Sequence, residues 1–277
     1  MISFHKAEAA DRVWAHEILK NCEYPGAEYA FSCMYLWSDY FGELGRVGDH
    51  LTQHASWRGR EVYLYPAGAG DIKGAIEAIR ADAAERGGPL RLRSLTKDKK
   101  EELEALYPGK FEFTACRNSY DYIYTVEELS ELHGKKLQSK RNHCNRFEDE
   151  FPDWFTAQEL DQLQLEKTAL QRAFDHFDEL EMDGLLLSDG ERIIAFSMGS
   201  RMNRDYYDVG FEKAFPDVNG AYAMINREFS RMIAEKYPEV QFLNREDDMG
   251  SEGLRRAKES YQPTVLLEKY VADWKEN

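Results

Sequence analysis

The sequence predicts two tandem domains of the α/β class, in which strands and helices alternate along the chain. The length of 277 residues is large for a single hydrophobic core and suits two domains of ordinary size. Each half shows strand-like and helix-like patterns in a similar order, as in layered α/β folds. A densely charged helical stretch, Glu127–Glu150, lies between the halves. We therefore expect domains at residues 1–134 and 135–277.

Periodicity and turn residues define the elements of the first half. In Ile72–Arg86 the apolar residues fall on one helical face, and Gly87, Gly88 and Pro89 end the helix. The Pro66–Gly70 cluster ends a hairpin-like pattern. The expected helices are Asp11–Leu19, Phe31–Tyr40, Ile72–Arg86 and Lys97–Leu106, and the expected strands are Val47–His54, Glu61–Tyr65, Leu90–Leu95 and Tyr120–Tyr124.

The second half follows a similar order. Asp189 and Gly190 form a strong hairpin-turn signal between two apolar strands. A long amphipathic pattern then places Met224, Phe229 and Ile233 on one face. The expected helices are Gln164–Phe177, Ala221–Tyr237 and Glu252–Tyr261, and the expected strands are Gly184–Ser188, Ile193–Met198, Asp205–Phe211, Val240–Leu243 and Thr264–Tyr270.

Composition excludes several classes of protein. The formal net charge of −15 repels nucleic acid and anionic membranes at long range, so a polyanionic ligand requires a local basic patch. No apolar run approaches the roughly 18 residues of a membrane span, and the first ten residues lack a signal core. The four cysteines form no CxxC pair, and no zinc-site spacing occurs. We expect a cytoplasmic protein without a metal.

A polar block follows the short apolar strand Val240–Leu243. Ligand sites in open α/β sheets lie just beyond the carboxyl ends of strands. Glu246 or Asp247 is the natural general base, and Arg245 is a clamp for an anion or a carbonyl, with Asn244 beside them. The alternative is structural: Asp247 or Asp248 caps the next helix and Arg245 forms an ion pair. For Asp248 we favour the structural role.

The acidic chain contains one dense basic run, in which Lys135 and Arg146 flank Lys136, Lys140 and Arg141. At helical spacing Lys136 and Lys140 share a face, to which His143 is a further candidate. A phosphate-rich donor such as tRNA would need such a patch. The alternative is a solvated helix face whose charges pair with neighbouring carboxylates.

Segments of the second half carry a resemblance to a known family. They are Gly210-Phe211-Glu212-Lys213, Asn219-Gly220-Ala221-Tyr222, Ile225-Asn226, Asn244-Arg245-Glu246-Asp247-Asp248-Met249-Gly250, Gly253-Leu254-Arg255, Ala257-Lys258, Ser260-Tyr261 and Glu268-Lys269-Tyr270. Together they resemble the soluble bacterial proteins grouped with the C-terminal domain of phosphatidylglycerol lysyltransferase. The resemblance implies two tandem GNAT-like (acyl-CoA N-acyltransferase-type) domains, akin to Fem-type peptidyltransferases.

The resemblance also implies where an acyl donor would bind. In a GNAT-like fold the donor lies where two central strands separate, beside the start of the following helix. Here that position is occupied by Asn219, Gly220, Ala221 and Tyr222, with Lys258 and Tyr261 as secondary candidates. The acetyl-CoA loop pattern is absent, so acetyl-CoA is a less suitable donor than aminoacyl-tRNA. The alternative is that Asn219 and Gly220 form a turn and a helix cap.

Two functional hypotheses follow. The first is an acyl- or aminoacyl-transferase that acts through its second domain, with aminoacyl-tRNA as donor and a small-molecule, lipid or peptide acceptor. The second is a catalytically degenerate GNAT-like protein that binds a ligand or regulates a partner. The family pattern also predicts a longer helical stretch between Phe155 and Gln164 than this chain has.

Overall fold

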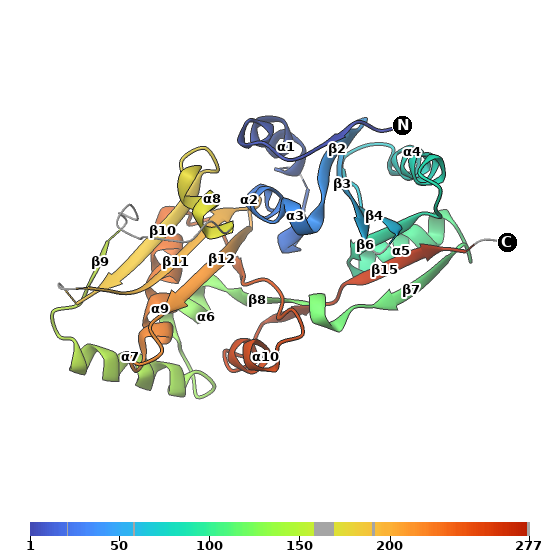
Figure 1. The fold of residues 1–277 in the computed structure, drawn as a ribbon. Coiled ribbons are helices and arrows are strands. Elements are labelled where there is room, and N and C mark those ends of the chain that lie inside the picture. The colour runs from blue at the N-terminus through green and yellow to red at the C-terminus, as the bar shows by residue number, and fades with distance from the viewer. Residues whose placement is uncertain (21, 58, 158–168, 190–191, 276–277) are drawn as a thin grey trace. The chain divides into compact units, whose positions relative to one another are not determined.

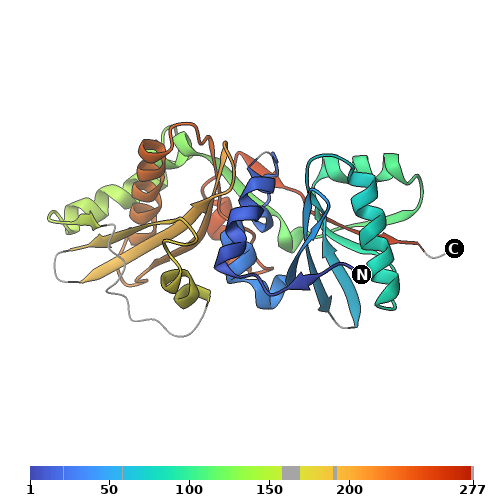
Figure 2. The same cartoon turned by 90° about the horizontal axis from the view of Figure 1, so that it is seen from above.

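The computed structural model describes residues 1–20, 22–57, 59–157, 169–189 and 192–275. The chain divides into two compact units (Figure 1, Figure 2). The first unit contains Met1–Asp121 and Leu267–Asn277, and the second contains Tyr122–Leu266. This division differs from the expected one after residue 134. The reason is that the last strand, β15 (Tyr270–Trp274), pairs with strands of the first unit.

The first unit is built on a mixed sheet of eight described strands in the order β1-β2-β3-β4-β6-β15-β7, with β5 paired to β3. The strands are β1 (Phe4–His5), β2 (Glu43–Val47), β3 (His50–Trp57), β4 (Arg60–Leu64), β5 (Ala67–Gly68), β6 (Arg91–Leu95), β7 (Phe111–Ala115) and β15. The helices are α1 (Arg12–Leu19), α2 (Phe31–Leu36), α3 (Ser38–Phe41), α4 (Ile72–Glu85) and α5 (Lys97–Leu106).

A cluster of three buried charged side chains binds the last part of the chain to this unit. The ammonium of Lys269 lies 2.6 Å from a carboxylate oxygen of Glu28 and 2.6 Å from one of Asp121. All three side chains are buried. Burying a charge is costly unless it is paired and hydrogen-bonded, and each member of this triad is paired. The triad thus joins three segments that are far apart in the sequence.

The second unit is built on a seven-stranded sheet of described strands in the order β14-β8-β13-β12-β11-β10-β9. The strands are β8 (Asp121–Thr125), β9 (Phe155–Ala157), β10 (Met182–Ser188), β11 (Ile193–Arg201), β12 (Tyr206–Ala214), β13 (Phe242–Asn244) and β14 (Val265–Leu267). The helices are α6 (Val126–Glu131), α7 (Gln138–Glu150), α8 (Ala169–Asp175), α9 (Ala221–Lys236) and α10 (Glu252–Glu259).

Helix α9 forms the centre of the second core. Its residues Ala221, Met224, Ile225, Phe229 and Ile233 are buried in one apolar cluster with side chains of β8, β10, β12 and α7. In Figure 1, α6 and α7 lie near α9. Helix α9 connects β12 to the parallel strand β13. Its packing in the core therefore holds the two strands in their paired positions.

Each unit contains a central parallel strand pair, and at each pair an arginine precedes a residue with left-handed backbone. In the first unit Arg93 lies in β6 beside β4, and the next residue, Ser94, has a φ of 63°. In the second unit Arg245 directly follows β13, and the next residue, Glu246, has a φ of 55°. Left-handed backbone is uncommon outside glycine and is concentrated at functional or constrained positions. The two units therefore share a local feature as well as an element order.

Several expected elements require correction. The charged bridge Glu127–Glu150 is two helices, because Leu132 and Gly134 adopt left-handed backbone between α6 and α7. The expected strand Thr264–Tyr270 is replaced by β14 and β15, which belong to different sheets. Strand β7 was not expected. The described part of the expected helix Gln164–Phe177 is α8, and most of the short segment after Phe155 lies outside the described residues.

Candidate functional site

The central strands of the second unit separate beyond a short paired region. Strands β12 and β13 pair in parallel from Tyr206 to Asp208 on one side and from Phe242 to Asn244 on the other. Strand β13 ends there, whereas β12 continues to Ala214 beside β11. An opening of this kind at the carboxyl end of a strand is a favoured ligand position in α/β sheets.

A register shift in β12 directs Glu212 toward α9. Met198 pairs with Phe211, but Ser200 pairs with Asp208, so β12 carries one extra residue in this interval. Such a bulge reverses the side-chain alternation, and bulges are over-represented next to active sites. Glu212 Oε2 accepts a hydrogen bond of 3.0 Å from the amide nitrogen of Asn226 on α9.

An ion pair lies at the opening. Arg245 Nη2 donates to Glu212 Oε1 at 2.7 Å, and only 11% and 10% of the two side chains are exposed. Burial by itself would lower the pKa of Arg245, but the charge of Glu212 outweighs it and the pKa is raised. The Glu212 carboxylate therefore bridges Arg245 and Asn226 and fixes the orientation of the guanidinium.

Two tyrosines and a lysine surround the guanidinium. The Arg245 Cζ atom lies 4.9 Å from the ring centre of Tyr261 and 5.7 Å from that of Tyr124. The ammonium of Lys140, from α7, lies 3.9 Å from the Tyr261 ring centre. Burial and the nearby charge of Arg245 lower the pKa of Lys140. Burial raises the pKa of both tyrosines.

Two polar atoms of the site have no hydrogen-bond partner among the described residues. They are Arg245 Nη1 and the side-chain oxygen of Asn226, and both are shielded from solvent. A buried donor or acceptor without a partner costs about 1–3 kcal/mol. Nearly all such groups in native proteins are satisfied, so each exception requires an explanation.

The loop after β13 distributes its polar side chains in different directions. The side-chain oxygen of Asn244 accepts from the backbone N–H of Glu246 at 2.7 Å, and Asp247 accepts from that of Met249 at 2.9 Å. The Lys258 ammonium donates to the carbonyl of Arg245 at 2.5 Å and also to that of Asp247. These side chains shape the loop, and of the predicted catalytic residues Arg245 alone joins the cluster around Tyr261.

Glu246 and Asp248 lie elsewhere in the same loop. A Cβ atom placed on Gly210 of β12 would lie 4.0 Å from Glu246 Oε1, so that carboxylate borders β12. The buried carboxylate of Asp248 accepts from Arg255 Nε at 2.8 Å and from the Tyr122 hydroxyl at 2.7 Å. Burial would raise the pKa of Asp248, but these hydrogen bonds hold it well below its usual value. The helix cap itself is Ser251, whose hydroxyl accepts from the N–H of Leu254.

The start of α9 is packed against α7. Gly220 has a φ of 85°, and a Cβ atom there would lie 2.3 Å from the carbonyl oxygen of His143. The glycine is thus explained by close helix packing. Ala221 is fully buried, whereas Asn219 is exposed and 46% of Tyr222 is exposed. The four predicted donor contacts therefore do not share one surface.

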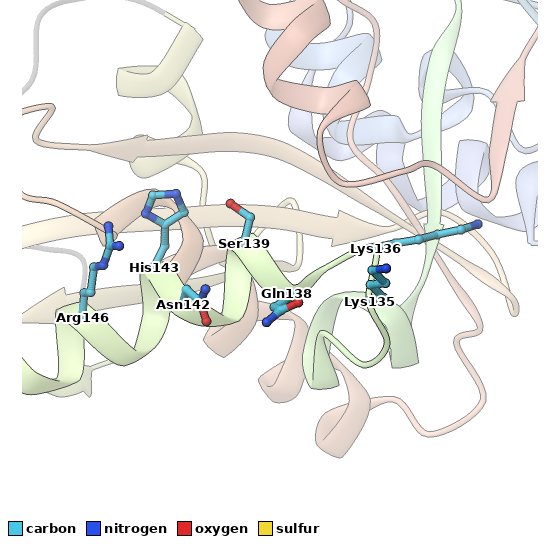
Figure 3. Close-up of a pocket in the computed structure, with 7 residues that line it drawn as sticks. All are labelled: Lys135, Lys136, Gln138, Ser139, Asn142, His143 and Arg146. Atoms are coloured by element: carbon cyan, nitrogen blue, oxygen red, sulfur yellow. The ribbon is translucent and has the colours of Figure 1, made fainter.

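The basic run separates into two groups. A groove of about 410 Å³ runs along α7 and is lined by Lys135, Lys136, Gln138, Ser139, Asn142, His143 and Arg146. Figure 3 shows His143 and Arg146 on the same side of the helix. Arg141 instead donates to the backbone carbonyls of Leu132 and Gly134, and Lys140 is stacked on Tyr261. Of the expected group, Lys136 and His143 thus line the groove with Arg146, whereas Lys140 lies on the Tyr261 ring.

Sequence reasoning did not select Glu212, Asn226 and Tyr124 as site residues. Glu212 and Asn226 belong to the segments that carry the family resemblance, and that was the available signal. Lys140 was expected to contact phosphate on an exposed helix face, not to contact a buried ring. No group of three or more His, Cys, Asp or Glu residues in the described part of the chain is arranged to hold a metal ion.

A family model described as phosphatidylglycerol lysyltransferase, C-terminal, matches residues 20–273. A protein from Mycoplasmoides gallisepticum, itself uncharacterized, is 26% identical over 176 residues, a match that spans 56% of this chain and 56% of that protein. Across the described residues, no helix is both long and apolar enough to cross a bilayer.

Solved structures are similar over nearly the whole chain. A conserved protein of unknown function from Bacteroides thetaiotaomicron is 33% identical, with a TM-score of 0.92 and coverage of 99% of this chain and 100% of that one. L-PGS from Bacillus licheniformis is 18% identical, with a TM-score of 0.67 and coverage of 100% and 95%. FemX is 7% identical, with a TM-score of 0.57 and coverage of 97% and 96%. The predicted pair of GNAT-like domains, akin to Fem-type proteins, is confirmed.

Proposed function

Because this chain belongs to the family described as phosphatidylglycerol lysyltransferase, C-terminal, we propose that it transfers an aminoacyl group at the strand opening of its second unit. The family and the structural neighbours support an aminoacyl-transferase-like function. The donor we propose is an aminoacyl-tRNA, and the acceptor is a hydroxyl or amine of a small molecule, lipid or peptide.

The observation that carries this proposal is the buried Arg245 at the opening. Glu212 holds one nitrogen of its guanidinium, and Nη1 has no partner among the described residues. A fixed donor in a water-excluded site is suited to stabilise the oxyanion that develops during acyl transfer. Arg245 would thus polarise the ester carbonyl, and Glu212 would act as its positioning residue.

The transfer step requires removal of one proton. The acceptor oxygen or nitrogen attacks the ester carbonyl carbon, the bond to the terminal ribose oxygen breaks, and the acceptor proton finally reaches that oxygen. The general base we propose is Glu246, the residue that follows Arg245 in the loop after β13. The Glu246 carboxylate borders β12 at Gly210.

The α7 groove supplies a site for the nucleic-acid part of the donor. The groove carries Lys135, Lys136, His143 and Arg146 in a protein whose formal net charge is −15. Local positive charge of this kind is what an anionic protein needs to bind phosphates.

We expect acetyl-CoA to bind weakly or not at all. The start of α9, where its pyrophosphate would lie, is closed by the packing of Gly220 against α7. A calorimetric dissociation constant near 1 μM for acetyl-CoA, about 8 kcal/mol of binding, would contradict this expectation.

Discharge of a mixed pool of radiolabelled aminoacyl-tRNAs tests the proposal. The protein should release label from tRNA faster than spontaneous hydrolysis, and label should appear on an acceptor when a cell extract is added. Arg245→Lys should reduce the rate by about 10²–10³-fold, as for loss of one oxyanion donor. An Arg201→Lys control should retain full activity. The proposal fails if no tRNA in the pool is discharged with any acceptor fraction.

A specific observation favours the second hypothesis, a catalytically degenerate binding protein. Asn244, Asp247 and Lys258 all use their side chains to hold the loop after β13. Under this hypothesis Glu246→Gln would leave cellular function intact, and a ligand would still raise the unfolding temperature. Loss of cellular function in a folded Glu246→Gln variant would exclude it.

A further inference from the structure

Two cationic side chains approach one tyrosine ring in the second unit. The Lys140 ammonium lies 3.9 Å from the ring centre of Tyr261, and the Arg245 Cζ atom lies 4.9 Å from it. Both oxygens of the Glu212 carboxylate are already hydrogen-bonded, one to Arg245 and one to Asn226. The side-chain ammonium of Lys140 has no hydrogen bond or ion pair with any described residue. The cluster therefore has two positive charges but one carboxylate, and donors of Lys140 and Arg245 remain unused among the described residues.

The unused donors define the chemistry of a ligand. Arg245 Nη1 carries two N–H groups without a partner among the described residues, of which the ester carbonyl of the proposed transfer takes one, and the ammonium of Lys140 has three N–H groups. A group that accepts several hydrogen bonds and carries negative charge matches both. We propose that an oxyanion, a carboxylate or a phosphate, binds beside the Tyr261 ring, between Lys140 and Arg245.

Entry of the oxyanion requires a side chain to move, because Arg245 Nη1 is shielded from solvent. The Tyr124 hydroxyl is fixed by a hydrogen bond to the carbonyl of Lys258, and Arg245 is fixed by Glu212. Lys140 is held only by its ring contact within the described structure, and its long side chain can rotate away from Tyr261. Its ammonium would then close over the bound oxyanion.

The substrate class follows if the proposed function holds, and this part rests on it. A lysyl group at the opening would place a third cation beside Lys140 and Arg245. The proposed oxyanion site between Lys140 and Arg245 thus selects against a cationic aminoacyl group. It accepts either the carboxylate of an acidic aminoacyl group or acceptor, or a phosphate near the 3′ end of tRNA.

Titration with small anions tests the site without any group transfer. Inorganic phosphate and succinate are titrated separately at constant ionic strength, with chloride as the balancing ion, and the arginine side-chain N–H resonances are followed by NMR. We expect saturable binding that shifts the Arg245 resonance. Lys140→Met, which keeps the apolar stem, should weaken binding at least tenfold. Lys213→Met removes an exposed charge from β12 outside the α7 groove and should leave the dissociation constant within twofold.

The arms of the titration identify the source of the oxyanion. If phosphate alone saturates the site, the oxyanion that binds there is a phosphate of the tRNA backbone. If succinate saturates it, the oxyanion is the carboxylate of an acyl group or of an acceptor. No saturation by either anion, or equal weakening in Lys140→Met and Lys213→Met, overturns the proposal. Because no aminoacyl-tRNA is present, absence of transfer activity has no bearing on this result. If Lys140→Met does not fold, Lys140→Gln replaces it.

Discussion

Removing the Glu212 carboxylate should lower the unfolding free energy of the second unit. The loss should be larger than that from removing one partner of an exposed ion pair with the same N–O distance. Glu212→Leu leaves the Arg245 guanidinium nine-tenths buried without its carboxylate. Breaking a buried pair by removing one partner costs about 3–5 kcal/mol, because the remaining charge is uncompensated. A second change, Arg245→Met, should recover part of this loss, since the double variant contains no unpaired charge.

The control is the Arg201–Glu239 pair of the same unit. Its N–O distance is also 2.7 Å, but 34% and 38% of the two side chains are exposed. Glu239→Gln should therefore have a far smaller effect. Hydrogen exchange measured in increasing urea reports the unfolding free energy of α9 and β12 separately from that of the first unit. Equal effects of Glu212→Leu and Glu239→Gln would refute the argument that Glu212 neutralises a buried charge.

Three further outcomes follow from the structure. Gly220→Ala should cost clearly more than Gly134→Ala in urea unfolding: both positions have left-handed backbone, which costs about 1–2 kcal/mol, but only at Gly220 would the new Cβ meet backbone atoms of α7. Asp248 has a lowered pKa in the folded state, so its stabilisation is present above its unfolded pKa of about 3.9 and is lost as pH falls below it; Asp248→Asn should flatten acid unfolding, and an unchanged pH profile would contradict this. Replacing Lys135 and Arg146 by Ala should lower the slope of log tRNA affinity against log salt by about 1.4–1.8, at about 0.7–0.9 for each phosphate contact, and an unchanged slope would exclude the groove as the tRNA site.

Local pattern predicted the amphipathic helices closely. The expected helix Ala221–Tyr237 corresponds to α9, Ala221–Lys236, and Ile72–Arg86 corresponds to α4, Ile72–Glu85. Apolar spacing and terminal glycine or proline residues are local signals, so one sequence contains enough information. The return of β15 to the first unit depends on pairing with β6 and β7, which are more than 150 residues earlier in the chain. No local pattern specifies such a partner.

The candidate site was predictable only in part, for a similar reason. Arg245 was identifiable because it directly follows a short apolar strand, and ligand sites in α/β sheets lie at the carboxyl ends of strands. Glu212 was missed because a bulge, visible only in the register of β11 and β12, directs it toward α9. The correspondence of Arg93 with Arg245 also depends on strand register and backbone angles, and the sequence shows no residue-level repeat.

The most direct measurement of the central claim is a crystal structure with a stable amide analogue of an aminoacyl-adenosine, the terminal part of a charged tRNA. We expect the analogue at the opening between β12 and β13, with its carbonyl oxygen within hydrogen-bond distance of Arg245 Nη1 and its ribose toward α7. Binding in the first unit, or at the second unit without contact to Arg245, would contradict the claim that this opening is the site of aminoacyl transfer.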